Sequence, residues 1–435
     1  MNGVPDVEAY IVAGDRKAAR IDGVPAGTAP RPVADVAVIG AGTMGGGIAL
    51  CAANAGLPVT IVEQSAEALE RGLGLIRRNY AGSVERGRLT GAEAAARLAC
   101  IRATTDYAAV ASADLVIEAV FEDMAVKETV FRTIDDIAKT GAVLASNTST
   151  LDLDRIAAFT RRPADVVGLH FFSPANVMRL LEIVRGAATA PDVLVTAMEF
   201  AGRIGKVGVV AGVCDGFIGN RMFGAYLRQA GLLLDLGVLP SEVDRALEAW
   251  GMAMGPFATM DLSGNDVCYA IRKRQEAEGA GRPDSEILDR VAEMGRYGQK
   301  TGAGFYRYDS ATRARTPDPE IDALVLAHAR GLGFAGGPVP DEEIVSRCVL
   351  ALVSEGVRLL QEGIAQRASD IDVVYRHGYG FPKARGGPML YADAAGLRNV
   401  IASIGQYGNA YRGELWQAPE LLLKAATAGR CLHEI

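Results

Sequence analysis

Short segments rich in valine and isoleucine alternate with alanine- and leucine-rich segments between about residues 33 and 210. The segments that have the character of strands are 36–39, 59–62, 115–119, 143–145 and 166–171. Strands that alternate with helices pair in parallel, and the helices cover the faces of the sheet. The first half of the chain is therefore expected to form an α/β domain of the Rossmann type.

The second half of the chain has a different character, because strand signals nearly vanish after Cys214 and long apolar runs carry helical periodicity. It also repeats itself: Gly237 and Asp244 match Gly363 and Asp370 at a common spacing of 126 residues. This repeat predicts a duplicated all-α region. The expected domains are a linker-like segment at 1–32, a nucleotide-binding domain at 33–212, and helical units at 213–312 and 338–435.

A glycine-rich turn joins the first expected strand to the helix after it. The turn reads Gly40-Ala-Gly42-Thr43-Met44-Gly45, which is a G-x-G-x-x-G pattern. In this context the first glycine permits a tight turn, the second lets the backbone approach a pyrophosphate, and the third lets the helix pack on the strand. The helix N-terminus then faces the phosphates. We expect Gly40, Gly42, Thr43, Met44 and Gly45 to bind a dinucleotide.

Glu63 ends the next expected strand, eighteen residues after Gly45. An acidic side chain at this position can accept hydrogen bonds from both ribose hydroxyls and repel a 2′-phosphate. Gln64 beside it offers no positive charge that would hold NADP. The pattern favours NAD as the cofactor, with a simple solvated strand end as the alternative.

His170 and Glu182 lie twelve residues apart, on segments rich in β-formers that flank the turn residues 173–176. A turn centred near Asn176 would make them neighbours. A carboxylate on the far nitrogen of an imidazole fixes its tautomer and stabilises its protonated form, as a catalytic base requires. The pair predicts a general-base dyad; taken alone, it fits a buried core histidine beside an edge-strand carboxylate equally well.

Ser149 and Asn220 are further candidates for catalysis. Ser149 follows the strand near 142–145, at the carboxyl edge where ligands of open α/β folds bind, although alone it suits a helix cap better. Asn220 opens the first long apolar helix, and the repeat places Ser346 at the equivalent position. Packing alone would call for the same residue in both copies, so the difference favours a functional role for Asn220.

Two basic segments can meet an anionic ligand in an otherwise acidic chain. Lys300 lies in a glycine-rich loop at 297–306, which can bring backbone amides and one ammonium near a phosphate or carboxylate. A plain surface turn is the alternative. Arg86 belongs to an arginine cluster at 77–88 that suggests contacts to the phosphates of a large substrate, with a solvated helix face as the alternative.

Composition excludes several classes of protein. The formal net charge of −7 argues against wholesale binding of nucleic acid or anionic membranes. No apolar run approaches the roughly 18 residues of a membrane span, and the N-terminus lacks the regions of a signal peptide. The six cysteines show neither metal-ligand spacing nor the density of a disulfide scaffold. We expect a cytoplasmic protein without a metal, since the C-terminus also matches no peroxisomal Ser-Lys-Leu signal.

With these motifs in order, residues 33–435 resemble the 3-hydroxyacyl-CoA dehydrogenase family, especially the dehydrogenase part of the multifunctional fatty-acid oxidation enzymes. The matching motifs are 40–45, Asn147-Thr-Ser149-Thr-Leu, Leu169-His170-Phe-Phe, Glu182 and Gly216-Phe-Ile-Gly-Asn220-Arg. The resemblance implies that Glu122 and Lys127 contact the cofactor and that Lys300 lies in the family's Lys-Thr-Gly-x-Gly-Phe-Tyr loop. Residues 1–32 resemble the linker after the hydratase part, and we expect no hydratase part in this chain.

The resemblance implies reversible, NAD-dependent oxidation of an (S)-3-hydroxyacyl-CoA to the 3-oxoacyl-CoA, as in fatty-acid β-oxidation. His170 would take the hydroxyl proton and Glu182 would hold its tautomer. Ser149 and Asn220 would position the developing carbonyl oxygen. The duplicated helical region looks like that of the multifunctional enzymes, in which the second copy completes the fold without adding a catalytic centre.

Two departures from the family pattern leave the substrate preference open. Ser173 stands where shorter dehydrogenases have asparagine, and Arg179 replaces a frequent lysine. We expect Ser173 and Arg86 to contact an acyl-CoA, a hydratase or thiolase to be a partner, and the chain to be a monomer or homodimer. Two alternatives remain: a dehydrogenase of another hydroxy acid, which the His170 and Glu182 pair disfavours, and a non-catalytic NAD-binding scaffold that docks a hydratase.

Overall fold

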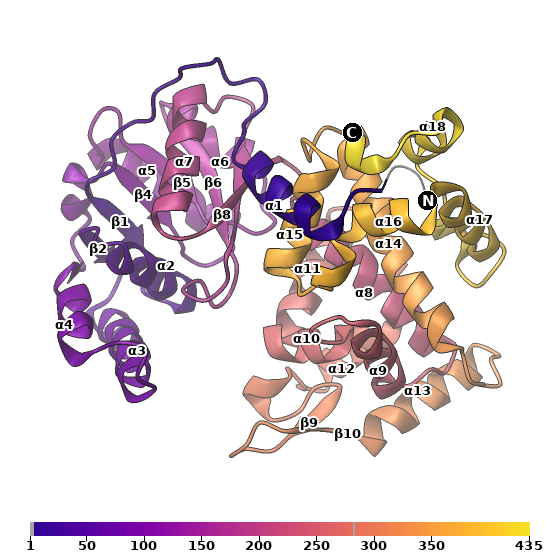
Figure 1. The fold of residues 1–435 in the computed structure, drawn as a ribbon. Coiled ribbons are helices and arrows are strands. Elements are labelled where there is room, and N and C mark those ends of the chain that lie inside the picture. Colours follow the sequence, from indigo (N-terminus) through magenta and orange to yellow (C-terminus); the bar gives the residue numbers. More distant parts are fainter. Residues whose placement is uncertain (1–3, 282) are drawn as a thin grey trace. The chain divides into compact units, whose positions relative to one another are not determined.

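The computed structural model of this chain describes residues 4–281 and 283–435. Its contacts divide the chain into two compact units (Figure 1). The nucleotide unit comprises residues 5–220, 359–378 and 435. The helical unit comprises Val4 and residues 221–358 and 379–434. Part of the second helical repeat therefore belongs, by its contacts, to the nucleotide unit.

An eight-stranded sheet forms the centre of the nucleotide unit. Its order is β3-β2-β1-β4-β5-β6-β7-β8, in which β6 and β7 are antiparallel and all other neighbours are parallel. The order reverses at β1, where open α/β sheets bind nucleotides outside the carboxyl ends of the strands. The strands are β1 (Val36–Ile39), β2 (Val59–Val62), β3 (Ile101–Thr104), β4 (Leu115–Glu118), β5 (Val143–Ser146), β6 (Val166–Phe171), β7 (Leu180–Arg185) and β8 (Val207–Gly212).

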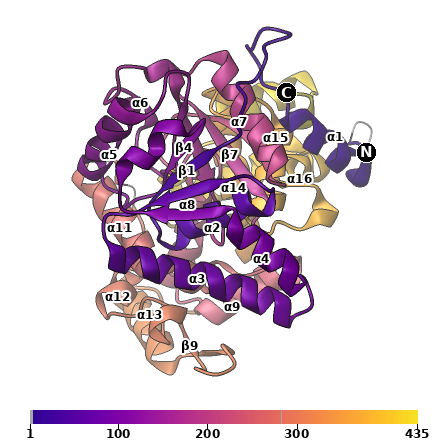
Figure 2. The same ribbon diagram turned by 90° about the vertical axis from the view of Figure 1, so that its left-hand side faces the viewer.

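Helices pack on this sheet through buried apolar side chains. Ile48 of α2, Ile76 of α3 and Phe200 of α7 share one core with alternate residues of the strands, so these three helices cover the same face. Helices α3 and α4, which Figure 2 shows side by side, both contact the edge strand β3. The helices of this part are α2 (Thr43–Asn54), α3 (Ala66–Glu85), α4 (Gly91–Ala99), α5 (Met124–Ile137), α6 (Leu153–Ala157) and α7 (Pro191–Arg203).

The opposite edge, at β8, is covered by segments from the two ends of the chain. Helices α1 (Val7–Ala18) and α15 (Ala368–Gly378) contact β8 and each other. The Tyr10 hydroxyl donates to Asp372 Oδ2 over 2.8 Å. Arg376 Nη2 donates to Asp15 Oδ1 over 2.7 Å. Because an open edge strand is a template for unwanted pairing, these helices protect the sheet.

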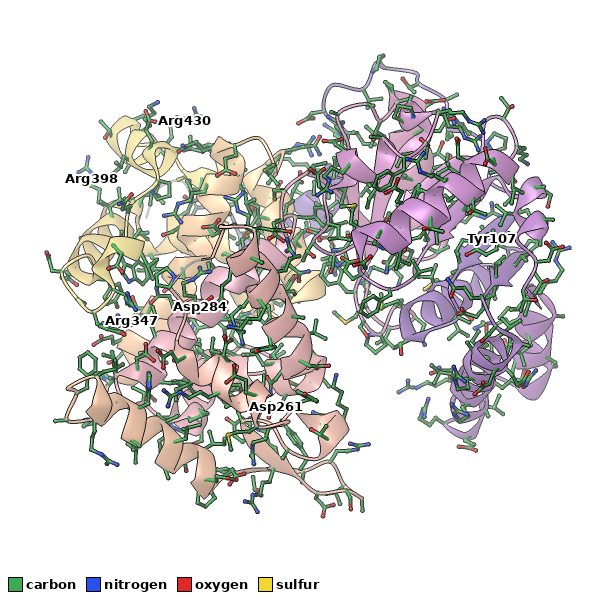
Figure 3. The ribbon with its side chains drawn as sticks, turned by 180° about the vertical axis from the view of Figure 1, so that it is seen from behind. Tyr107, Asp261, Asp284, Arg347, Arg398 and Arg430 are labelled. Atoms are coloured by element: carbon green, nitrogen blue, oxygen red, sulfur yellow. The ribbon has the colours of Figure 1, made fainter. Side chains whose placement is uncertain are left out.

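The predicted duplication lies mostly in the helical unit. Asp261 (Figure 3) accepts from the N–H groups of residues 305 and 306 over 2.9 and 3.0 Å, and Asp393 accepts from residues 432 and 433 over 2.6 and 2.9 Å. One carboxylate-to-backbone contact thus recurs in both copies. The first copy consists of α8 (Gly219–Asp235), α9 (Pro240–Trp250), α10 (Pro256–Ser263), α11 (Asn265–Ala277) and α12 (Glu286–Glu293), and α13 (Pro319–Gly331) follows it. The second consists of α14 (Asp341–Gln361), α15, α16 (Pro388–Ala395), α17 (Leu397–Tyr407) and α18 (Glu420–Ala428).

The predicted fold class, a Rossmann-type domain followed by duplicated helices, is confirmed. A short antiparallel pair, β9 (Tyr306–Tyr308) and β10 (Arg315–Pro317), is an addition that the sequence pattern does not predict. Within residues 4–281 and 283–435, no helix combines the length and apolar character needed to cross a bilayer. The six cysteines are all free thiols.

Candidate functional site

His170 on β6 and Glu182 on β7 face each other across the antiparallel strand pair. The register places them opposite one another, and His170 Nδ1 lies 2.7 Å from Glu182 Oε2. Both are buried, with exposed fractions of 5% and 0%. Because a carboxylate oxygen accepts, Nδ1 carries the proton and Nε2 keeps its lone pair. The predicted strand pair therefore places the carboxylate beside the imidazole, although the connection spans residues 172–179 and is longer than the predicted turn at 173–176.

Glu182 also fixes the start of α8. Its Oε1 atom accepts from the N–H groups of Ile218 and Gly219 over 3.1 and 2.9 Å. These donors belong to the positive end of a helix, so they stabilise the negative charge of the carboxylate. Asn220 follows Gly219 directly. The carboxylate that orients His170 thus also sets the backbone position of Asn220.

Two aromatic rings flank the imidazole. The ring centroids of Phe172 and Phe217 lie 4.4 and 5.7 Å from that of His170. Phe217 is buried and adopts a positive φ of 50°, an uncommon conformation for a bulky side chain that is often found at functional sites. Sequence reasoning missed Phe217, whose only signal is its place beside Gly216 in the asparagine motif.

The glycine turn between β1 and α2 has the shape that a pyrophosphate needs. Gly40 has a φ of 104°, and a Cβ there would lie 2.7 Å from the oxygen of Ala119. A Cβ on Gly45 would lie 2.0 Å from the oxygen of Gly40, whereas no atom stands within 4 Å of one on Gly42. Within the described part of the chain, no side chain caps the first N–H groups of α2. These open amides fit the phosphates of a dinucleotide.

Glu63 lies directly after β2, beside the glycine turn. Its Oε2 atom accepts from the N–H of Ala41 over 2.8 Å. A carboxylate at this place is where the ribose hydroxyls of a dinucleotide are bound in this fold. Tyr107 (Figure 3) lies near it, and burial, reinforced by the charges of Glu63 and Glu118, raises the pKa of the Tyr107 hydroxyl.

An ion-pair network joins the end of β4 to α5 and to the loop of Ser149. Lys127 Nζ bonds Glu118 Oε1 over 2.7 Å and lies 3.2 Å from Glu122 Oε2. Glu122 Oε1 accepts from the Thr148 hydroxyl and the Ser149 N–H, each over 2.7 Å. Burial raises the pKa of the Glu122 carboxyl, but the Lys127 charge and these hydrogen bonds outweigh it, so the pKa lies below its usual value. Lys127 is only 1% exposed, and its ammonium lies between the carboxylates of Glu118 and Glu122.

Two residues that sequence reasoning missed connect this network to the dyad. Glu118 is fully buried, and its Oε2 atom accepts from the Ser146 hydroxyl over 2.6 Å. An acidic residue at the end of a buried strand is the signal that could have revealed it. Asn147 Oδ1 accepts from the N–H of Phe171 over 2.9 Å. The loop that carries Ser149 is thereby joined to the strand that carries His170.

The remaining predicted residues lie at the surface. Ser173 is exposed in the turn between β6 and β7, and Arg86 is exposed at the end of α3. Lys300 belongs to the helical unit, where its ammonium pairs with the Asp266 carboxylate over 2.6 Å. The structure brings together His170, Glu182 and the start of α8, and it separately joins Glu122 to Ser149.

A possible metal-ligand grouping occurs in the described residues at the end of the chain. Ligand atoms of Asp393, Cys431 and His433 lie within 4.8 Å of one another. Both Asp393 oxygens already accept backbone N–H groups there, as those of Asp261 do in the first copy. The repeated structural contact accounts for the position of Asp393.

Two family models match the chain. Residues 35–214 match the 3-hydroxyacyl-CoA dehydrogenase, NAD binding domain. Residues 216–308 and 344–433 match the 3-hydroxyacyl-CoA dehydrogenase, C-terminal domain. The first match confirms NAD as the cofactor predicted from the sequence. The division of the second match into two segments agrees with the duplication.

Known proteins show the same likeness over most of the chain. The peroxisomal bifunctional enzyme of Danio rerio is 42% identical over 414 residues, which are 92% of this chain and 57% of that enzyme. This chain therefore spans little more than half of that relative. The solved structure of 3-hydroxybutyryl-CoA dehydrogenase from Escherichia coli has a TM-score of 0.79 at 28% identity, covering 92% of this chain and 99% of the other. The dehydrogenase part of multifunctional enzyme 1 from C. elegans has a TM-score of 0.70 at 28% identity, covering 98% and 100%.

Proposed function

Because this chain belongs to the 3-hydroxyacyl-CoA dehydrogenase family, as its motifs predict, we propose that it interconverts (S)-3-hydroxyacyl-CoA and 3-oxoacyl-CoA with NAD. The observation that carries the proposal is the buried contact of 2.7 Å between His170 Nδ1 and Glu182 Oε2. It leaves His170 Nε2 ready to accept a proton. The match to 3-hydroxybutyryl-CoA dehydrogenase over nearly its whole length supports this substrate class.

The chemistry of the step follows from the dyad. In the oxidation, His170 Nε2 accepts the proton of the substrate hydroxyl while the hydrogen on C3 leaves as hydride. Bound NAD⁺ supplies the hydride acceptor. Glu182 stabilises the imidazolium, and the N–H groups of Ile218 and Gly219 hold its second oxygen in place. The rings of Phe172 and Phe217 limit the access of water to the imidazole.

Ser149 and Asn220 supply the donors that position the carbonyl oxygen formed at C3. Replacing Asn220 with serine, the residue of the second copy, should lower kcat about 10- to 100-fold, because one hydrogen bond to that oxygen is lost. Steady-state kinetics with acetoacetyl-CoA and NADH measure the effect. Ser346→Asn serves as the matched control and should leave kcat unchanged. Wild-type kcat in Asn220→Ser would limit Asn220 to a packing role.

The cofactor is held by Gly40, Gly42, Thr43, Met44 and Gly45, with Glu63 on the adenosine ribose. Glu63→Ala should weaken NADH binding about tenfold and narrow the preference for NADH over NADPH, because the carboxylate no longer bonds the ribose hydroxyls or repels a 2′-phosphate. Fluorescence titration with each nucleotide measures both changes. Glu67→Ala, at an exposed carboxylate in the first turn of α3, is the control. An unchanged NADH-to-NADPH ratio in Glu63→Ala would contradict the ribose contact.

Further contacts complete the proposed site. Glu122 shapes the loop of Ser149 and, with Lys127 behind it, contributes to cofactor binding. Ser173 contacts the acyl-CoA, and Arg86 meets its phosphates. Lys300 of the helical unit is proposed as an additional cofactor contact.

The decisive assay is NADH oxidation by the full chain with acetoacetyl-CoA. Turnover with NADH and little with NADPH supports the proposed reaction, and a series of 3-oxoacyl-CoA thioesters then gives the chain-length preference. NADH binding without turnover of any thioester would favour the alternative that the chain is a non-catalytic NAD-binding scaffold. Turnover of a free hydroxy acid in place of a thioester would favour a dehydrogenase that acts on another hydroxy acid.

For the cellular setting, we infer a cytoplasmic enzyme of fatty-acid β-oxidation. Six free cysteines suit a reducing compartment, and fractionation of the source cells distinguishes it from the peroxisomal setting named for the relative from Danio rerio. A hydratase that makes the substrate and a thiolase that consumes the product are the proposed partners. Light scattering of the chain, alone and with each enzyme, distinguishes monomer, homodimer and complex.

A further inference from the structure

Lys206 lies between α7 and β8, and its side chain extends to the turn between β6 and β7. The ammonium donates to the carbonyl oxygens of Ala175, over 2.5 Å, and of Met178. Among the residues that the structure describes, no carboxylate pairs with it. Burial lowers the pKa of the Lys206 ammonium, although the neighbouring Cys51 thiol opposes this shift. Burying half of a cation without a counter-ion costs free energy of folding. A lysine that is kept at this position therefore calls for a physical explanation.

The turn that Lys206 holds is fixed to α2, the helix that begins at the glycine turn. Ala175 is 1% exposed, and the Cys51 thiol on α2 donates to its carbonyl oxygen over 3.3 Å. A Cβ on Gly47 of α2 would lie 2.9 Å from Ala175 Cβ, so the backbones are in close contact. Most of the other turn residues, 173, 174, 176 and 177, are exposed. The contacts of Ala175 and Lys206 therefore hold the turn in position.

The same turn is continuous with the dyad. It begins after Phe172, whose ring centroid lies 4.4 Å from that of His170. A shift of the turn would move Phe172 against the imidazole and displace Ser173. We propose that Lys206 is a positioning residue, which clamps the turn at 173–178 onto the cofactor helix and so holds the acyl-CoA side of the site in register with His170. This proposal rests on the proposed function.

Kinetics of three variants test the clamp. Lys206→Met keeps the length of the side chain without the charge, and Lys206→Arg keeps the charge and donors. Lys139→Met is the control: the Lys139 ammonium also bonds a backbone carbonyl, that of Ser112, over 2.9 Å, and in addition the Asp114 carboxylate. Lys206→Met should lower kcat/KM for acetoacetyl-CoA about 10- to 100-fold, because misplaced reacting groups lose effective molarity. The Kd of Lys206→Met for NADH should stay at the wild-type value. Lys206→Arg should recover most of the lost kcat/KM, and Lys139→Met should keep the wild-type kcat/KM.

A second measurement does not depend on activity. Cys51 is 4% exposed beneath the turn, so maleimide labelling of its peptide, followed by mass spectrometry, should be faster in Lys206→Met than in the wild type. Labelling of Cys51 in Lys206→Met at the wild-type rate would overturn the clamp. Wild-type kcat/KM in Lys206→Met would overturn it as well, and so would a fall in kcat/KM that is as large in Lys206→Arg as in Lys206→Met. An inactive wild type contradicts the proposed function, whereas the labelling still tests the clamp. If Lys206→Met does not fold, Lys206→Gln gives the same comparison.

Discussion

Replacing His170 with glutamine should lower kcat for acetoacetyl-CoA reduction by about 10² to 10⁴ while leaving the Kd for NADH unchanged. Reduction needs the proton that the imidazolium gives to the forming alkoxide, and a carboxamide cannot supply it. The glutamine amide can still donate to Glu182 Oε2, so the buried carboxylate keeps a partner. Steady-state absorbance of NADH gives kcat, and fluorescence titration gives the Kd.

A second histidine with a carboxylate partner provides the control for this variant. His328 Nε2 lies 3.1 Å from Asp235 Oδ1 in the helical unit, and its side chain is 8% exposed. His328→Gln makes the same change at a comparable histidine–carboxylate contact and should keep wild-type kcat. A His170→Gln enzyme with most of its kcat would show that water or another group moves the proton. Equal losses in both variants would indicate a structural effect.

The sequence was sufficient to predict the parts of the site that depend on local geometry. His170 and Glu182 are twelve residues apart, and the connection at 172–179 between two apolar strands fixes their register. The glycine turn is equally local, because its steric demands arise within 40–45 and at Ala119. Asn220 could be selected because the duplication provides an internal comparison.

The parts that were not predicted depend on contacts between distant segments. The bond from Tyr10 to Asp372 joins residues 362 positions apart, and no local pattern indicates that 359–378 packs with the nucleotide unit. Lys127 is a different case, because its partners Glu118 and Glu122 are close to it in the sequence. The family motif marks it as a cofactor contact, whereas its ammonium is buried between two carboxylates, because α5 turns this face toward β4.

Glu182→Gln should be nearly as damaging as the loss of His170, with a fall in kcat of about 10² to 10⁴, because a carboxamide cannot satisfy both neighbours of the carboxylate. Oε2 accepts from His170, and Oε1 accepts from the N–H groups of residues 218 and 219. If the amide oxygen faces the backbone donors, its NH₂ group faces His170 and requires an acceptor at Nδ1. The proton then moves to Nε2, where the base must be free. The opposite orientation places NH₂ against two N–H donors at the start of α8, which costs free energy of folding and shifts Asn220.

The double variant distinguishes a shared role from two separate ones. If Glu182 acts only by orienting His170, then His170→Gln combined with Glu182→Gln should lose no more kcat than His170→Gln alone, because the second change removes a function that is already absent. Additive losses would mean that Glu182 contributes separately, through the start of α8 and Asn220. Thermal unfolding of each variant identifies the second route, since a displaced helix start lowers Tm while a changed tautomer does not. The Glu182 carboxylate would then have two roles: it would orient His170, and it would position the start of the helix that carries Asn220.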